Sequence, residues 1–160
     1  MGAKYDPARI QLANYPFALS MQPRFGDMDS LGHVNNVAIA ALFEEARIAM
    51  NRALLGANHG GLPHERRPLP VVAARVEIDY LGEVAYPGTY EVGVGIGRLG
   101  NTSILQVCGL FEGETCLALC DTVIVHRSEN GPAPVPERVR GVLASMSFPA
   151  SAQVPAGSDS

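Results

Sequence analysis

Residues 27–55 read DMDSLGHVNNVAIAALFEEARIAMNRALL and contain the pattern that decides the fold. In the second part of this stretch, apolar side chains recur at the three- and four-residue spacing of a helix. Asn35 or Asn36 is a good N-cap for such a helix, and Gly56 is a typical residue just beyond a helix C-terminus. We therefore predict one long helix that ends at Leu55. Its apolar stripe is formed by Ile39, Leu42, Phe43, Ala46, Met50, Ala53 and Leu54.

The first part of the stretch gathers polar groups where that helix begins. Asp27 and Asp29 precede a glycine turn, and His33 and the two asparagines follow it. The first backbone N–H groups of a helix have no partner within the helix, so they can polarise a carbonyl oxygen. A nearby carboxylate or imidazole can then carry out proton transfer.

Five strands are predicted around the helix. One precedes it, and the other four follow it with alternating apolar and polar residues. They span residues 17–22, 72–80, 90–97, 102–111 and 115–126, with a hairpin turn near Gly113. One face of residues 90–97 is rich in glycine, which permits close approach of a packed helix, the favoured interpretation, or of a ligand. This order of elements predicts an α+β domain with an antiparallel sheet.

The chain is expected to hold one domain, residues 16–146. Residues 1–15 form an ill-defined lead-in, and residues 147–160 have the composition of a disordered tail. Pro136 is expected to start a short helix, and residues 56–70 form an unusually long loop, either a lid or an insertion.

Composition narrows the class of protein. The 160 residues carry a net charge of −4 without any basic stripe, so no nucleic-acid partner is expected. No secretory signal or apolar run of membrane-spanning length is visible, and no membrane association is expected. The odd number of cysteines (Cys108, Cys116 and Cys120) fits a reduced cytoplasmic protein. No spacing typical of metal ligands is present.

The run Asp27-x-Asp29-x-x-Gly32-His33-Val34-Asn35-Asn36, followed by residues 43–47 (FEEAR), resembles the hot-dog-fold acyl-CoA thioesterases of the 4-hydroxybenzoyl-CoA thioesterase type. The resemblance implies a five- or six-stranded antiparallel sheet wrapped round one long central helix. It also implies a homodimer or homotetramer that hydrolyses an acyl-CoA, with an acyl carrier protein as the alternative donor. No cofactor is implied, because coenzyme A is part of the substrate.

The resemblance also implies roles for residues. Asp29 is the general base or the nucleophile, His33 assists proton transfer, and the backbone N–H of Asn36 polarises the thioester carbonyl. An ionised carboxylate is a weak base in water, so Asp29 is expected to be partly buried. Relatives bind phosphopantetheine near the bend between two strands, across a subunit boundary. Substrate contacts are accordingly expected from Asn35, Arg98, Asn101, Thr102 and Ser103.

Simpler interpretations remain open at this point. Asp27 and Asp29 are also typical turn formers, Asn35 and Asn36 are typical caps, and a histidine such as His33 often serves only as a structural hydrogen-bonding group. Two other functions are compatible with the fold: a module that binds acyl-CoA or another apolar ligand without turnover, and an enoyl-thioester hydratase.

Overall fold

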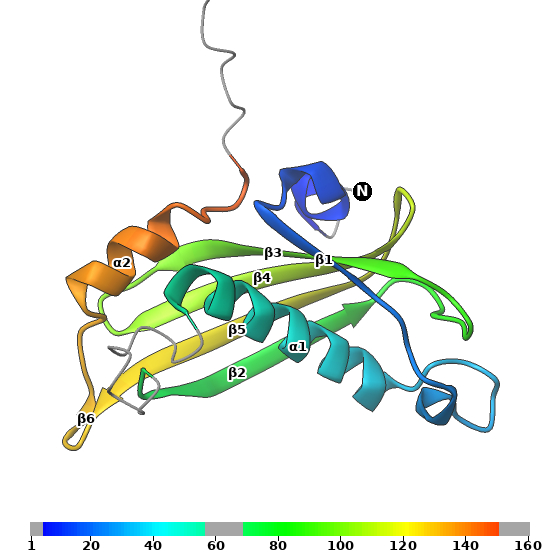
Figure 1. Ribbon diagram of the computed structural model, residues 1–160, viewed down its shortest axis with the longest axis horizontal. Coiled ribbons are helices and arrows are strands. Elements are labelled where there is room, and N and C mark those ends of the chain that lie inside the picture. Colours follow the sequence, from blue (N-terminus) through cyan, green and yellow to red (C-terminus); the bar gives the residue numbers. More distant parts are fainter. Residues whose placement is uncertain (1–4, 57–68, 151–160) are drawn as a thin grey trace, which may run out of the picture.

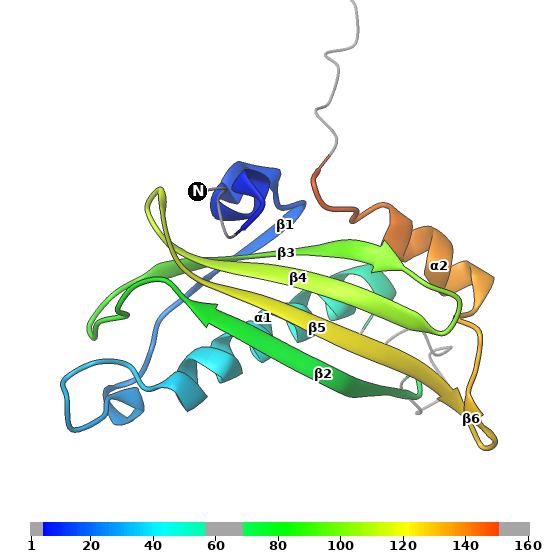
Figure 2. The same ribbon diagram turned by 180° about the vertical axis from the view of Figure 1, so that it is seen from behind.

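The structure, a computed structural model, describes residues 5–56 and 69–150. Five long strands form one antiparallel sheet in the order β1-β3-β4-β5-β2, and β6 pairs with the end of β5. The helix α1 lies against one face of this curled sheet, as Figures 1 and 2 show from its two sides. The predicted hot-dog architecture is therefore confirmed. The strands are β1 (Phe17–Met21), β2 (Val71–Tyr80), β3 (Tyr90–Leu99), β4 (Ser103–Glu112), β5 (Thr115–Ser128) and β6 (Gly131–Pro132).

The helix α1 (Asn36–Leu55) has the predicted extent and the predicted caps. Asn35 is the N-cap residue, and Gly56 adopts φ 79° just after the last turn, a backbone conformation that glycine adopts without strain. The second helix, α2 (Glu137–Ala144), begins one residue after Pro136. The short β6 was not predicted, because two residues carry no periodic signal.

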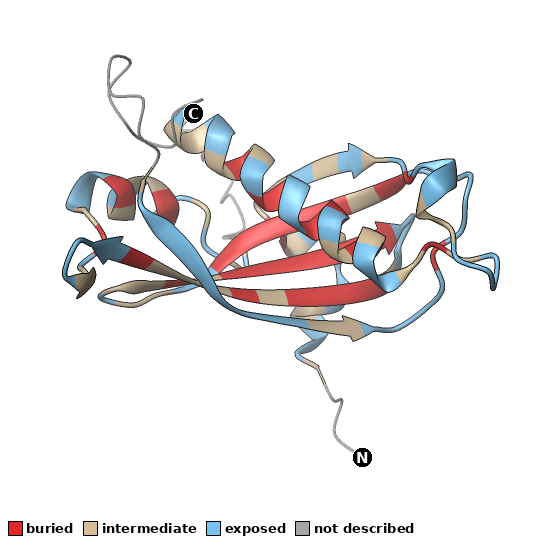
Figure 3. Cartoon of the chain, turned by 90° about the horizontal axis from the view of Figure 1, so that it is seen from below, coloured by how far each residue is buried: buried red, intermediate tan, exposed pale blue. Residues whose placement is uncertain are grey.

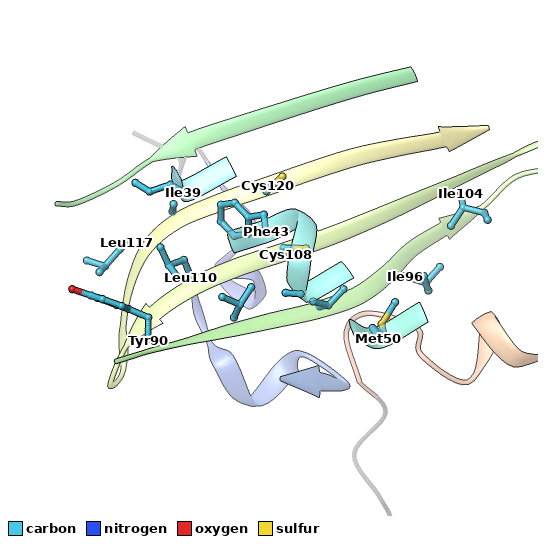
Figure 4. Packing of buried hydrophobic residues seen from close by; sticks show 14 of the residues in the cluster. Ile39, Phe43, Met50, Tyr90, Ile96, Ile104, Cys108, Leu110, Leu117 and Cys120 are labelled. Atoms are coloured by element: carbon cyan, nitrogen blue, oxygen red, sulfur yellow. The ribbon is translucent and has the colours of Figure 1, made fainter. Parts of the chain in front are cut away.

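The main core lies between α1 and the sheet (Figure 4). Phe43, Ala46 and Met50 are fully buried on the helix, and they face Val92, Val94, Cys108 and Leu110 of the central strands. Burying a large apolar side chain of this kind contributes about 1.5–3 kcal/mol. The helical stripe predicted from the sequence is thus the face that holds α1 on the sheet, except for Ala53, which is exposed near the end of the helix.

A second, smaller cluster lies on the opposite face of the sheet and corrects two expectations. The lead-in is folded from Tyr5 onward, with 3₁₀ turns η1 (Pro7–Ile10) and η2 (Leu12–Asn14). Its Tyr15 fills the space above Gly93 and Gly109, while Pro16 and Phe148 lie over Gly95. The glycine face of β3 therefore receives neither a helix nor a ligand but two irregular segments of the chain.

Part of the predicted C-terminal tail is also ordered. Ser147 forms a bridge with Ile96, and the ring of Phe148 lies 4.7 Å from that of Tyr15. The rest of that tail, residues 151–160, and most of the predicted loop, residues 57–68, lie outside the described residues.

Strand β2 is one of the two edges of the sheet, and it is almost entirely exposed over its ten residues (Figure 3). Val76 and Tyr80, which share the α1 side of the sheet with Ile78, keep 50% and 43% of their surface exposed. A long edge with exposed apolar side chains is a surface on which another strand can pair.

Candidate active site

The segment between β1 and α1 is fixed first by Asp27, the last residue of the 3₁₀ turn η3 (Phe25–Asp27). The Asp27 carboxylate accepts hydrogen bonds from the backbone N–H of Arg24 at 2.7 Å and from its guanidinium at 3.0 Å. These hydrogen bonds from Arg24 hold the pKa of Asp27 below its usual value. Asp27 is thereby committed to shaping the turn, as the simpler interpretation of this residue suggests.

Asp29 closes the next turn. One carboxylate oxygen, Oδ1, accepts from the backbone N–H of Leu31 at 2.9 Å and from that of His33 at 3.4 Å. The backbone N–H of Asp29 donates to the carbonyl of His33, and Gly32, at φ 84°, donates back to the carbonyl of Asp29. Within the described residues Oδ2 has no hydrogen-bonding partner. One oxygen thus orients the carboxylate, and the other is free for chemistry.

The start of α1 is held by Asn35. Its Oδ1 accepts from the backbone N–H of Ala38 at 2.8 Å, while its Nδ2 donates to the carbonyl of Asp27 at 2.8 Å. The backbone N–H groups of Asn36 and Val37 have no acceptor among the described residues. The side chain of Asn35 thus serves as the cap, while two helix N-terminal amides stay available to a ligand.

His33 has a partner that sequence reasoning missed. Its Nε2 lies 3.1 Å from Oε2 of Glu83, in the segment that follows β2. The carboxylate fixes the orientation of the imidazole ring. No pattern in the neighbouring sequence marks Glu83 as a site residue. It comes close to the start of α1 only because the chain, at the end of β2, lies beside that end of the helix. The backbone shows the same approach, since Val34 N–H donates to the carbonyl of Val84 at 2.8 Å.

These groups surround one open cavity of about 800 Å³. Asp29, His33 and Asn36 all line it, as do Asn35 and Glu83. Apolar side chains complete the walls, and two of them are strongly exposed, Leu31 at 78% and Val37 at 81%. Asp29 is exposed as well, whereas the sequence predicted a partly buried carboxylate. The apolar part of the wall is formed by Leu31, Val34, Val37, Ala38, Ile39, Ala41, Leu42, Tyr80 and Val84.

Comparison with known proteins identifies the family to which this site belongs. The model of the thioesterase-like superfamily matches residues 23–143, which include the turn, α1 and all the long strands after it. The chain belongs to the thioesterase-like superfamily.

Solved structures agree with that assignment. A thioesterase from Thermus thermophilus, determined with coenzyme A and zinc, is 28% identical and superposes with a TM-score of 0.71, covering 83% of this chain and 95% of that one. A Bacillus stearothermophilus protein described as a predicted thioesterase is 26% identical, with a TM-score of 0.71 and coverage of 82% and 96%. These relatives support thioester hydrolysis as the general activity.

A relative in Bacillus subtilis strain 168 is the uncharacterized protein YsmA. It is 28% identical over 122 residues, which make up 75% of this chain and 79% of that protein.

Four of the predicted substrate-binding residues of this thioesterase-like chain lie far from the cavity. They lie at or beside the bend between β3 and β4, whereas the cavity adjoins the Tyr90 end of β3: Arg98 near the end of β3, Asn101 and Thr102 in the bend, and Ser103 at the start of β4. The ten residues of β3 separate the two places by about 30 Å. Within one chain they do not share a site with Asp29, and their role remains a prediction that requires a second copy.

Two features are absent from the described part of this thioesterase-like chain. Among residues 5–56 and 69–150, no group of three or more His, Cys, Asp or Glu side chains is arranged to hold a metal ion. In the same part of the chain, no helix is both long and apolar enough to cross a membrane.

Proposed function

We propose that this protein hydrolyses the thioester of an acyl-CoA to the free acid and thiol, as a thioesterase of the 4-hydroxybenzoyl-CoA thioesterase type. The observation that carries the proposal is that the Asp29 carboxylate and the unpaired amides of Asn36 and Val37 line the same cavity. The Thermus thermophilus thioesterase with coenzyme A supports the choice of a CoA thioester. An acyl carrier protein is the alternative donor.

The chemistry follows from the properties of these groups. The thioester oxygen accepts hydrogen bonds from the helix N-terminal amide of Asn36, which stabilise the negative charge that develops there. Asp29 either removes a proton from the attacking water or attacks the carbonyl carbon itself. His33, oriented by Glu83, donates a proton to the departing thiolate. The apolar wall around Val37 and Leu42 receives the acyl group.

The bend at the end of β3 fits the proposal once two copies pair. The Val71 end of β2 lies next to this bend, because Val71 pairs with His126, whose N–H donates to the carbonyl of Thr102. The Tyr80 end of β2 lies at the cavity. Antiparallel pairing of two β2 edges therefore brings the bend of one copy toward the cavity of the other, where Arg98 and the polar side chains of the bend meet coenzyme A.

The test is thiol release from a panel of aliphatic and aromatic acyl-CoAs and from acyl carrier protein thioesters. Replacing Asp29 by Asn is expected to lower kcat/KM by roughly a thousandfold, because base or nucleophile function is lost. The fold stays intact because Asp29 is exposed and Asn can still accept the turn hydrogen bonds. Glu112→Gln, which changes an exposed carboxylate of the β4–β5 hairpin that does not line the cavity, is the matched control and should retain full activity.

Three results would overturn the proposal. Full hydrolysis by the Asp29→Asn variant would remove Asp29 from the chemistry. Tight acyl-CoA binding with no thiol released over hours would identify a binding module instead. Hydration of an enoyl-CoA, with the thioester left intact, would identify a hydratase.

A further inference from the structure

Arg140 of α2 is fixed against the bend that joins β3 to β4, a contact that the proposed chemistry does not use. The helix is anchored by Val139 and Leu143, which are buried in the main core. From there one nitrogen of the guanidinium, Nη2, donates to the carbonyl of Gly100 at 2.8 Å and to that of Asn101 at 3.1 Å. Figures 1 and 2 both show α2 beside this end of the two strands. One cation therefore binds two successive carbonyls of the bend.

Other parts of the chain also bind the carbonyls of the bend. The carbonyl of Asn101 accepts a second hydrogen bond, at 2.9 Å, from the backbone N–H of Val135. The carbonyl of Thr102 accepts from the backbone N–H of His126 at 2.9 Å. The bend is thus held by α2, by the segment before α2 and by β5, and all the carbonyl groups of residues 100–102 have donors within the chain.

The direction of these carbonyls fixes the direction of two backbone N–H groups. The peptide units of the bend are trans, and in a trans unit the carbonyl and the N–H point in opposite directions. The carbonyls of Gly100 and Asn101 are turned onto Arg140. The N–H groups of Asn101 and Thr102 belong to the same two peptide units, so they are turned away from Arg140. Neither N–H has an acceptor among the described residues, and Asn101 is exposed.

The outer side of the bend consequently offers donors to a ligand. Besides the two N–H groups, the side chains of Asn101, Thr102 and Ser103 make no hydrogen bond within residues 5–56 and 69–150, and Arg98 beside them is exposed. Phosphate oxygens accept strong hydrogen bonds from backbone N–H groups. A carbonyl turned outward in their place would repel a phosphate, so the direction of the two peptide units decides whether the bend attracts or repels it.

We propose that Arg140 is a positioning residue for coenzyme A. By binding the carbonyls of Gly100 and Asn101, it keeps the N–H groups of Asn101 and Thr102 directed toward the phosphate groups of the ligand. This role rests on the proposed function, in which the bend of one copy meets the coenzyme A bound at the cavity of the other. Arg140 acts through the two peptide units and not through contact with the substrate, because its guanidinium is engaged within the chain.

Steady-state kinetics with two substrates that carry the same acyl group test this role. Arg140→Ala is expected to raise KM for the acyl-CoA about tenfold, because hydrogen bonds to ionised phosphate are weakened, while kcat changes less than about twofold. The rise in KM should disappear with the acyl thioester of N-acetylcysteamine, which has no phosphate group. Arg140→Lys, whose ammonium group still donates to the two carbonyls, should recover most of the affinity for the acyl-CoA.

Arg138→Ala removes an exposed arginine of the same helix and is the matched control for a general loss of positive charge. It should keep the KM of the wild type for both substrates. An unchanged KM in Arg140→Ala, an equal rise in Arg138→Ala, or an equal rise with the N-acetylcysteamine thioester would overturn the proposal.

An NMR titration of the isotope-labelled wild type with coenzyme A covers the case in which Arg140→Ala fails to fold. The amide signals of Asn101 and Thr102 are expected to shift, and a titration in which neither shifts would overturn the proposal without any variant. The titration also separates this role from thioester hydrolysis. If the wild type releases no thiol but both amides respond to coenzyme A, and the response is lost in Arg140→Ala, hydrolysis is refuted and the role of Arg140 is supported. If the wild type hydrolyses the N-acetylcysteamine thioester and neither amide responds, the role of Arg140 alone is refuted.

Discussion

Two irregular segments flank β1, and they use their polar and aromatic groups in opposite ways. The lead-in, residues 5–16, covers the outer face of the sheet and buries Tyr15 to 6% exposure. The turn, residues 22–35, stays open and lines a cavity. In the lead-in, Arg9 donates to the carbonyls of Cys108 and Cys120 and forms an ion pair with Asp121 at 2.7 Å. In the turn and the first residues of α1, Oδ2 of Asp29 and the backbone N–H groups of Asn36 and Val37 make no hydrogen bond with the described residues.

The two segments therefore have different roles: the lead-in contributes to stability, and the turn presents the groups that could carry out chemistry. Groups of the lead-in reach across to distant strands, so they hold the sheet together. Groups of the turn bond mostly to one another, so they hold a shape and leave reactive atoms accessible. Substitutions in the lead-in are therefore expected to change stability alone, and substitutions in the turn are expected to change activity more than stability.

Tyr15→Ala is expected to have the largest effect on stability. The ring packs on Phe111 and Phe148, and its hydroxyl donates to the carbonyl of Arg9 at 2.8 Å. Removing a buried aromatic side chain costs about 3–5 kcal/mol in the free energy of unfolding. Chemical denaturation measures this loss, and kcat at a temperature where the variant is folded should equal that of the wild type.

Tyr15→Phe is the matched control for that experiment. It keeps the ring over Gly93 and removes only the hydroxyl, so about 1 kcal/mol should be lost. If Tyr15→Ala were as stable as Tyr15→Phe, the lead-in would not hold the sheet, and the contrast between the two segments would fail.

The sequence predicted the turn far better than the lead-in, and the reason is physical. The cap, the glycine turn and the start of α1 are local features, so Asn35, Gly32 and Asn36 could be placed from neighbouring residues alone. The position of Tyr15 depends on Gly93 and Gly109, which lie far along the chain. A glycine face on a strand indicates that something approaches closely, but it does not indicate what.

Contacts between distant parts of the chain also explain which residues of the candidate site the sequence did not predict. Asp29, His33 and the helix amides were expected to lie near one another, and they do line one cavity. Glu83 reaches His33 only through the pairing of β2 with β5, which no local pattern reveals. The bend at residues 98–103 could not be placed from one chain, because its expected contribution crosses to a second copy.

Asn35→Ala is expected to have an intermediate effect, because it removes the cap that positions the free amides. Loss of a side-chain N-cap costs about 1 kcal/mol in the free energy of unfolding. The substitution also removes the hydrogen bond to the Asp27 carbonyl, so kcat/KM should fall as the helix start becomes less well fixed. Asn36→Ala is the matched control for stability, since its side chain makes no hydrogen bond with the described residues, and it should stay within about 0.5 kcal/mol of the wild type. Equal stability of Asn35→Ala and Asn36→Ala would show that the cap does not hold the turn.

Asp27→Asn is expected to have the smallest effect, and that effect depends on pH. Hydrogen bonds from Arg24 lower the pKa of Asp27 in the folded state. Because the pKa is lowered on folding, the ionised carboxylate stabilises the fold at pH values above the ordinary aspartate pKa of about 3.9. This contribution to stability is lost as the pH falls through the pKa of Asp27 in the folded state. The melting temperature of Asp27→Asn should therefore lie below that of the wild type at pH 7, and the two values should converge in acid. Thermal melts from neutral pH down to strongly acidic pH measure this difference. A gap that stays constant over the whole range would mean that Asp27 stabilises the turn without its charge, and the ion pair with Arg24 would then be irrelevant to the shape of the site.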